Sequence, residues 1–332
     1  MIPTSFQALV VTEQAGRYVP AIESVPLAQL PVGDLLISVR YSSLNYKDAL
    51  SATGNKGVTR RYPHVPGIDA AGVVVQSTTP DFAEGAEVIV TGFDLGMNTW
   101  GGLGEYIRVP AAWALPLPAG LSAHEAMGLG TAGLTAGLAV RHLLQAGLTP
   151  EKGEVVVSGA SGGVGSLATA LLAHLGFAVV AVSGKNDPAF LLGTLGARRV
   201  LSREEFTGAY DQKPLAAPAF AAGVDTVGGP LLSGMLKATY YAGLVTCCGM
   251  VASADLVTSV FPFILRGVQL VGIDSVLAPL AVRQHVWQQW ATDWKLPQLG
   301  ELTRDISLAD APAKLAELLA GQARGRYVVV HA

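Results

Sequence analysis

The fold is decided by the segment Val155-Val156-Val157-Ser158-Gly159-Ala160-Ser161-Gly162-Gly163-Val164-Gly165. A β-branched run ends in a glycine-rich turn, where Ala160, Gly162 and Gly165 take the spacing G-x-G-x-x-G with alanine at the first place. A helix-like apolar stretch, residues 163–175, and a second short strand follow. Glycine at the second place lets a pyrophosphate approach the backbone, and glycine at the third lets helix and strand pack closely. The segment therefore predicts a dinucleotide-binding turn that opens a parallel α/β sheet.

The tip of the second strand distinguishes the two nicotinamide cofactors. An NAD-specific site places an acidic residue about 20 residues after the turn, against the ribose hydroxyls. Here the tip reads Ser183-Gly184-Lys185, and Arg203 follows the third predicted strand. A hydroxyl and two cations suit a 2′-phosphate, which favours NADPH. Asp187, two residues beyond Lys185, could instead bind the ribose hydroxyls of NAD, so this alternative stays open. In a second alternative, Lys185 and Arg203 are solvated surface charges without a role in cofactor binding.

Strand and helix patterns predict two domains. Residues 1–126 alternate short apolar runs with turn signals, which is typical of a compact β-rich domain. Longer helix-like segments then alternate with short β-branched runs, which indicates βαβ units and a doubly wound parallel sheet. We predict six strands in that sheet, at residues 154–158, 178–182, 199–201, 223–227, 244–248 and 268–272.

The end of the chain is predicted to return to the first domain. A helix-like segment, residues 308–319, precedes a final strand at residues 326–330. The first domain is therefore expected to be discontinuous, formed by residues 1–126 and 299–332, with residues 127–298 as the cofactor domain. The Ala/Pro-rich segment 216–222 is expected to be a surface loop.

Composition excludes several classes of function. Half of the 332 residues are hydrophobic, so the chain can bury a large core. Its net charge of -3 and lack of a long basic run argue against nucleic acid as a partner. The most apolar stretch, residues 164–182, is divided by His174 and Gly176, which argues against a membrane span. With no secretory signal or lipidation motif, and two adjacent cysteines, Cys247 and Cys248, we expect a cytoplasmic protein.

Five further segments are distinctive: Ser42-Ser43-Leu44-Asn45-Tyr46-Lys47-Asp48-Ala49-Leu50, Pro66-Gly67-Ile68-Asp69, Trp100-Gly101-Gly102, Gly130-Thr131-Ala132-Gly133 and Phe261-Pro262-Phe263-Ile264-Leu265-Arg266. Together they closely resemble the acryloyl-CoA reductase family, which was formerly grouped with putative quinone oxidoreductases. The resemblance implies a GroES-like β-rich catalytic domain, a Rossmann domain that binds NADPH, a small acyl-CoA substrate and a homodimer. It also implies an NADPH site lined by Tyr46, Ser161, Gly162, Gly163, Val164, Ser183, Gly184, Lys185, Arg203, Met250, Ile264, Ser275 and Gln322. Met250 is as readily interpreted as a core methionine near a strand end.

Zinc is not expected. Zinc-binding relatives carry a cysteine at or beside the position of Asn45, a Gly-His-Glu at Gly67-Ile68-Asp69, and four clustered cysteines. No cysteine precedes residue 247, so neither a structural four-cysteine site nor a cysteine-containing catalytic site can be assembled in the first domain.

Bound NADPH without a metal restricts the chemistry to hydride delivery. When hydride reaches the β-carbon of an unsaturated thioester, negative charge develops on the thioester oxygen, which needs a hydrogen-bond donor. Asn45, Tyr46, Asp48 and Asp69 are the candidate catalytic residues, with the first two as donors and the aspartates orienting them. The alternatives are that Tyr46 packs on the cofactor, that Asp48 caps a short helix, and that Asp69 braces a turn.

The predicted function is NADPH-dependent reduction of the α,β double bond of a short enoyl-CoA, with conversion of acryloyl-CoA to propanoyl-CoA as the predicted reaction. The first alternative is an NADPH:quinone oxidoreductase with an open apolar acceptor site. The second is a nucleotide-binding protein with a structural or regulatory role, which would bind NADPH without turning it over.

Overall fold

The computed structural model describes residues 2–331, and the chain divides into two compact units. Unit 1 comprises Met1–Thr131, Val276–Ala291 and Leu299–Ala332, and unit 2 comprises Ala132–Ser275 and Thr292–Gln298. The sequence placed residues 276–291 in the cofactor domain, whereas the structure groups them with unit 1. The physical reason is Arg283, whose buried guanidinium donates to the Thr91 carbonyl at 2.7 Å and lies 4.2 Å from the centre of the Phe93 ring.

Unit 2 is built on a six-stranded parallel sheet, which confirms the predicted doubly wound fold. The strand order is β10-β9-β8-β11-β12-β13, so the chain runs outward from β8 to β10 and then returns to the other side of β8. Ligands bind outside the carboxyl ends of the strands at such a reversal. The strands are β8 (Val155–Ser158), β9 (Val179–Val182), β10 (Arg199–Leu201), β11 (Phe220–Asp225), β12 (Thr239–Cys247) and β13 (Gln269–Gly272).

One expectation about unit 2 was wrong in part. The segment 216–222 was predicted to be a surface loop. Residues 216–219 lie outside any helix or strand, but residues 220–222 are the first three of β11. Phe220 is fully buried, and its ring lies 6.0 Å from that of Phe206 and 5.1 Å from that of Tyr210. Burial of this aromatic group outweighs the turn propensity of the neighbouring prolines.

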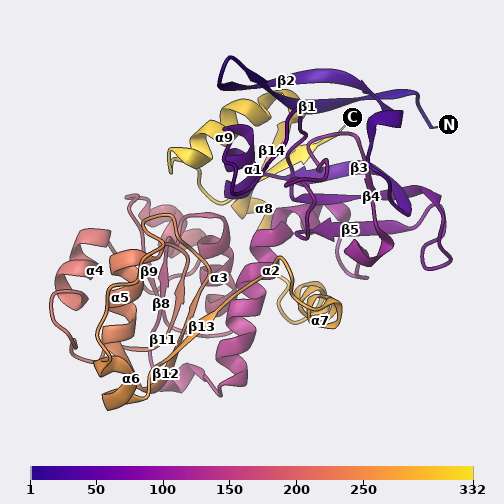
Figure 1. The fold of residues 1–332 in the computed structure, drawn as a ribbon. Coiled ribbons are helices and arrows are strands. Elements are labelled where there is room, and N and C mark those ends of the chain that lie inside the picture. Colours follow the sequence, from indigo (N-terminus) through magenta and orange to yellow (C-terminus); the bar gives the residue numbers. More distant parts are fainter. Residues whose placement is uncertain (1, 332) are drawn as a thin grey trace. The chain divides into compact units, whose positions relative to one another are not determined.

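Helices cover both faces of this sheet, which explains why all four residues of β8 are buried. In Figure 1, α4 and α5 lie on one side of the strands, and α3 and α2 lie on the other. The helices are α2 (Ala123–Gln145, which begins in unit 1), α3 (Gly163–His174), α4 (Arg203–Tyr210), α5 (Gly229–Ala238) and α6 (Phe261–Arg266), with short helical turns at Pro150–Lys152 and Ala189–Thr194. None of the described helices is both long and apolar enough to cross a bilayer.

Unit 1 is a largely antiparallel β domain. Its seven-stranded sheet has the order β14-β15-β3-β4-β5-β7, with β6 paired to β3, and β1 and β2 form a separate hairpin. The strands are β1 (Ser5–Gln14), β2 (Arg17–Pro26), β3 (Leu35–Ser43), β4 (Asp69–Ser77), β5 (Glu87–Thr91), β6 (Tyr106–Val109), β7 (Ala114–Pro116), β14 (Thr303–Ser307) and β15 (Arg326–Val330). As predicted, the final strand returns to this domain, where Val328 of β15 faces Ser43 of β3.

Most helices of unit 1 come from the last sixty residues of the chain. The helices are α1 (Tyr46–Ala52), α7 (Leu280–Ala291), α8 (Leu299–Leu302) and α9 (Ala311–Leu319), with short turns at Leu27–Gln29, Ala111–Trp113 and Leu308–Asp310. The helical path of α2 is interrupted at Gly130, where φ is 53°. A Cβ at this position would lie 2.4 Å from a carboxylate oxygen of Asp69, so only glycine allows the backbone to approach that side chain.

Candidate functional site

A buried polar network in unit 1 is centred on Asp69, the first residue of β4. Its Oδ2 accepts hydrogen bonds from the Ser43 hydroxyl at 2.6 Å and from Asn45 Nδ2 at 2.8 Å. The Thr131 hydroxyl donates to Oδ1 at 2.6 Å, and the Thr131 backbone N–H donates to both oxygens. Asp69 thus joins the end of β3, the start of α1 and the interrupted part of α2.

Arg326, the first residue of β15, completes this network. Its guanidinium donates to the Ser43 hydroxyl at 2.8 Å and to Asn45 Oδ1 at 3.2 Å, and Nη2 lies 3.8 Å from Asp69 Oδ2. Burial lowers the pKa of Arg326, while the charges of Asp69 and Asp48 act in the opposite direction. A fully buried cation of this kind is tolerated only because carboxylates and hydrogen-bond acceptors surround it.

Asp48 is a second fully buried carboxylate, in the first turn of α1. Its Oδ2 accepts the Asn45 backbone N–H at 2.7 Å, and its Oδ1 accepts the N–H groups of Gly67 and Ile68 at 3.1 and 2.9 Å. Burial, followed by the charge of Asp69, raises the pKa of Asp48 to about 7. The contact with Asn45 supports the interpretation that Asp48 caps α1. The contacts with Gly67 and Ile68 also connect α1 to the loop before β4.

The four candidate catalytic residues differ in what their side chains still offer. Asn45 already donates to Asp69 and accepts from Arg326, and it is only 8% exposed. Its amide therefore serves the network more readily than a substrate oxygen. Tyr46, the first residue of α1, is 38% exposed, which makes its hydroxyl the accessible donor of the set.

Three members of this network were missed in the sequence: Ser43, Thr131 and Arg326. Arg326 carried a usable signal, because it stands in the otherwise apolar strand Arg326-Tyr327-Val328-Val329-Val330. A charged residue in a buried strand requires an opposite charge nearby. The partner, however, is more than 250 residues away in the chain, and only the fold reveals it.

The glycine turn of unit 2 has the geometry that the sequence predicts. Gly162 is the N-cap of α3, and the helix has no side-chain cap. A Cβ at Gly165 would lie 2.2 Å from the carbonyl oxygen of Gly159, which explains the glycine at the third place. The first N–H groups of α3 are thus available for an anion, and they carry the positive end of the helix dipole. A dinucleotide pyrophosphate fits this end of the helix.

The tip of β9 gathers several predicted cofactor residues. The hydroxyls of Ser161 and Ser183 lie 3.2 Å apart, and Ser183 also accepts the Lys185 N–H at 3.0 Å. The Arg203 guanidinium lies over Gly184, since a Cβ there would be 2.9 Å from Arg203 Cζ. This arrangement leaves an exposed cation at the carboxyl edge of the sheet.

Asp187, the residue that left NAD open, already has a structural role. Its Oδ1 accepts the Phe190 N–H at 3.2 Å, which connects it to the helical turn Ala189–Thr194. This contact favours the NADPH interpretation of the tip.

The remaining predicted cofactor residues are more scattered. Met250 and Ile264 are 70% and 69% exposed, so the core interpretation of Met250 is wrong. Ser275 is buried and accepts a hydrogen bond from the Thr135 hydroxyl at 2.8 Å. Tyr46 and Gln322 belong to unit 1, where Gln322 is exposed just beyond α9. These assignments stay predictions.

The polar groups that brace the glycine turn were also missed. Asp225, at the carboxyl end of β11, accepts the Ser158 hydroxyl at 2.7 Å and the Gly228 N–H at 2.8 Å. Ser158 in turn accepts the Thr226 N–H at 2.8 Å. Burial raises the pKa of Asp225. The pair holds β8 and β11 together at the strand reversal where the cofactor turn begins.

The described part of the chain contains candidate metal ligands and two thiols. Over residues 2–331, no three His, Cys, Asp or Glu side chains form a group suited to hold a metal. The two cysteines are free thiols, and burial raises the pKa of both, to about 12 for Cys248. Such thiols are poor nucleophiles at neutral pH.

Comparisons with known proteins agree with both units. The alcohol dehydrogenase GroES-like domain model matches residues 31–119, and the zinc-binding dehydrogenase model matches residues 163–294. The acrylyl-CoA reductase AcuI of Ruegeria pomeroyi is 44% identical over 326 residues, covering 98% of each chain.

Two solved structures are similar over the whole chain. The yhdH oxidoreductase of Salmonella enterica, solved in complex with NADP, has a TM-score of 0.95 at 45% identity. The match covers 98% of the present chain and 100% of the yhdH chain. The yhfP protein of Bacillus subtilis, solved with NAD bound, has a TM-score of 0.95 at 43% identity, with 99% and 100% coverage. With its full-length match to AcuI and both dehydrogenase domain models, the chain belongs to the acrylyl-CoA reductase family of the medium-chain dehydrogenase/reductase superfamily.

Proposed function

We propose that the protein reduces the α,β double bond of a short enoyl-CoA with NADPH, converting acryloyl-CoA to propanoyl-CoA. The observation that carries this proposal is the 44% identity to an acrylyl-CoA reductase over 98% of both chains. The reaction consumes NADPH, which supplies the hydride for the β-carbon. The substrate's α-carbon takes up a proton.

The choice of NADPH rests on the tip of β9. Ser183 and Lys185 stand where an NAD-specific enzyme has an acid, and the Arg203 guanidinium lies beside them over Gly184. A salmonella relative was solved with NADP, whereas a bacillus relative was solved with NAD. The cation and hydroxyl at this tip favour the first of these two cofactors.

We assign the residues of unit 1 different tasks. Tyr46, with its exposed side chain, donates a hydrogen bond to the thioester oxygen as negative charge develops there. Asn45, Asp48 and Asp69 are positioning residues, because they hold one another and the start of α1 through buried hydrogen bonds. Arg326 keeps the two carboxylates compensated.

The decisive experiment compares NADPH oxidation with acryloyl-CoA, crotonyl-CoA and a simple quinone as acceptors. We expect the highest kcat/KM with acryloyl-CoA. Tyr46→Phe should lower turnover roughly a hundredfold if the hydroxyl donates, with little change in NADPH binding. Turnover on the quinone that equals or exceeds turnover on acryloyl-CoA would favour the quinone oxidoreductase alternative. That alternative is suggested by the 44% identity to the putative quinone oxidoreductase YhfP of Bacillus subtilis. Tight NADPH binding without turnover on any acceptor would support the non-enzymatic alternative.

We further infer that activity does not require zinc. Although a zinc-binding dehydrogenase model matches residues 163–294, no cysteine precedes residue 247, and Ile68 stands where zinc-binding relatives carry histidine. Exhaustive chelation should leave turnover intact, and loss of activity together with stoichiometric zinc would contradict this inference.

We also infer a homodimer that resides in the cytoplasm. The edge strand β13 is only half-buried, and the neighbouring helix α6 exposes Phe261, Ile264 and Leu265, an apolar surface suited to a second copy. Two free cysteines suit a reducing compartment. Sedimentation velocity that shows only monomers would contradict the dimer, and fractionation of the source cells tests the location.

A further inference from the structure

A separate pocket lies in unit 2, near the amino end of β8, whereas the glycine turn follows the carboxyl end of β8. It has a volume of about 250 Å³ and is lined by Leu143, Ala146, Leu148, Lys152, Ala221, Ala222, Tyr240, Tyr241, Ala242, Gly243 and Leu244. Ala222 pairs with Val155 at the start of β8, whereas the glycine turn follows Ser158 at the end of β8. The pocket is therefore distinct from the cofactor site.

An irregular stretch of β12 forms one wall. Thr239 pairs with Phe220, and the next pair along the two strands is Leu244 with Ala222. Four residues of β12, 240–243, therefore lie between these pairs, against a single residue of β11. The extra residues include Ala242, whose φ of 58° is rare for an L residue. Bulges and strained residues of this kind gather where a fold re-aims side chains toward a ligand.

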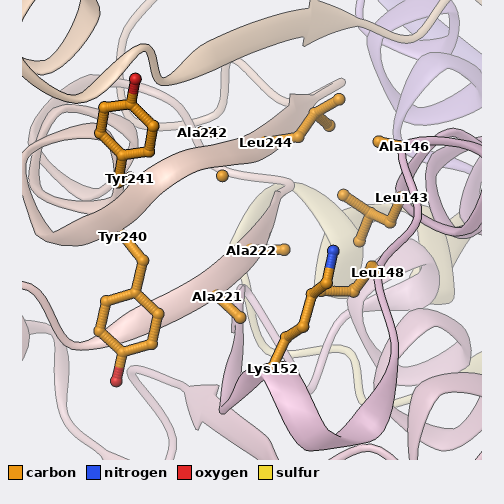
Figure 2. A pocket seen from close by; sticks show the side chains of 11 residues that line it. Leu143, Ala146, Leu148, Lys152, Ala221, Ala222, Tyr240, Tyr241, Ala242 and Leu244 are labelled. Atoms are coloured by element: carbon orange, nitrogen blue, oxygen red, sulfur yellow. The ribbon is translucent and has the colours of Figure 1, made fainter.

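The wall carries two tyrosines with polar ends. Tyr241 is 79% exposed, and the Tyr240 ring is held against Gly153, where a Cβ would lie 3.0 Å from it. In Figure 2 the two rings point in opposite directions from the strand, and the alanine and leucine side chains face the space beside them.

Lys152 is the one charged residue of the lining. Lys152 is exposed, and Figure 2 shows its side chain extending toward Leu143 and Leu148. Within residues 2–331 it forms no ion pair. The nearby carboxylate of Glu154 is already engaged by Arg199, with a closest distance of 2.6 Å. The pocket therefore offers a positive charge that the protein itself does not neutralise.

We propose that this pocket binds a small monocarboxylate with an apolar body, whose carboxylate pairs with Lys152. The leucine and alanine side chains cover the apolar body. A water molecule occupies about 30 Å³ of liquid, so the space holds on the order of eight non-hydrogen atoms, close to the nine of benzoate. The proposal does not depend on the reaction catalysed at the cofactor site.

The test titrates the full chain, saturated with NADPH, with benzoate, and follows binding by ligand-observed NMR. Saturation with NADPH keeps benzoate out of the cofactor site. Benzamide and benzylamine serve as neutral and cationic probes of the same shape. We expect saturable binding of benzoate, weaker binding of benzamide and none of benzylamine. High salt should weaken only the benzoate interaction.

Two variants and one control separate this site from any other. Lys152→Gln should weaken benzoate binding about three- to tenfold and leave benzamide unchanged, because only the charge pair is lost. Lys213→Gln, which alters an exposed lysine of the same unit outside the pocket, should change neither. Ala146→Leu adds bulk at an exposed lining position and should abolish binding of both probes.

Three results would overturn the proposal. The first is benzoate binding that is unchanged in either Lys152→Gln or Ala146→Leu. The second is no saturable binding to the wild type. The third is dissociation of an oligomer by Tyr241→Ser in sedimentation velocity, which would assign the pocket to contact with a second copy.

Discussion

The Asp69 network of unit 1 and the glycine turn of unit 2 use buried polar groups in opposite ways. Asp69 and Asp48 together accept hydrogen bonds from side chains and backbone N–H groups, and Arg326 supplies the compensating charge. The network is satisfied by the protein itself. At the glycine turn, by contrast, α3 begins without a side-chain cap, and an exposed Arg203 stands at the neighbouring strand tip.

This difference separates positioning from binding. A closed network has little to offer a ligand, and its members hold backbone segments in place. An uncapped helix start beside a cation leaves donors and charge for a ligand's phosphates. Substitutions in the first region should therefore act on stability, and substitutions in the second should act on cofactor affinity.

The largest effect is expected from Asp69→Asn. The substitution preserves size but removes the charge that faces Arg326 and replaces one acceptor oxygen by a donor. Loss of one partner of a buried pair typically costs about 3–5 kcal/mol in the free energy of unfolding. Urea unfolding of the two proteins measures this difference.

The matched control is Asp305→Asn, which alters a 57% exposed carboxylate paired with His124. It should change the free energy of unfolding by less than about 1 kcal/mol. Equal effects of the two substitutions would show that the buried pair of Asp69 and Arg326 contributes no more to stability than an exposed pair.

Asp48 predicts a pH dependence of stability. Its pKa is raised to about 7 in the folded protein from an ordinary value of 3.8. Between these values the folded state keeps a proton that the unfolded state releases, so the free energy of unfolding should fall as the pH rises toward 7 and level off above it. The slope within this window is at most about 1.4 kcal/mol per pH unit.

The comparison with Asp48→Asn isolates this contribution. His331, with a pKa lowered to about 4, and His64, with a lowered pKa, act in the opposite direction, because their stabilising effect is lost as the pH falls. Both histidines remain in the variant, so their effects cancel in the difference between the two proteins. Parallel stability curves for wild type and variant between pH 5 and 8 would show that Asp48 does not titrate in this range.

The glycine turn of unit 2 could be predicted from the sequence because the residues that form it are neighbours in the chain. The turn from Gly159 to Gly165, its strand and its helix are neighbours in the chain, and Ser183-Gly184-Lys185 ends the next strand. The six strands of the parallel sheet were predicted for the same reason, since each contains a short apolar run between helix-like segments, although β11 and β12 begin three and five residues earlier than predicted.

The Asp69 network of unit 1 was harder to predict because the residues that form it are distant from one another in the chain. Asp48 and Asp69 were recognised as polar candidates, but Arg326 is far from both in sequence, and its pairing depends on β15 returning beside β3. Burial also assigns roles that residue type does not: it makes Asn45 part of the network and leaves Tyr46 accessible. Long-range pairing likewise explains why α7 belongs with unit 1, through Arg283.

Gly165→Ala should weaken NADPH binding and should lower the free energy of unfolding by less than Asp69→Asn does. The new Cβ would lie 2.2 Å from the Gly159 carbonyl oxygen, a backbone atom that cannot move aside freely. The turn and the start of α3 must shift, and overpacking of this kind typically costs about 1–3 kcal/mol. We expect the NADPH dissociation constant to rise about ten- to a hundredfold, as measured by fluorescence titration. An unchanged dissociation constant would mean that the start of α3 does not contact the cofactor.

The smallest effect is expected from Gly184→Ala, which tests the cofactor tip more selectively. Here the new Cβ would lie 2.9 Å from Arg203 Cζ, the end of a flexible side chain, so the guanidinium can swing away while the backbone stays in place. Stability and NADH binding should be unchanged, because neither depends on Arg203. NADPH binding should weaken about threefold to tenfold, since the displaced guanidinium no longer meets the 2′-phosphate in its original geometry. Fluorescence titration with both cofactors distinguishes the outcomes. An equal loss for NADH and NADPH would place the damage in the backbone of the tip, and Arg203 would then lose its role in cofactor choice.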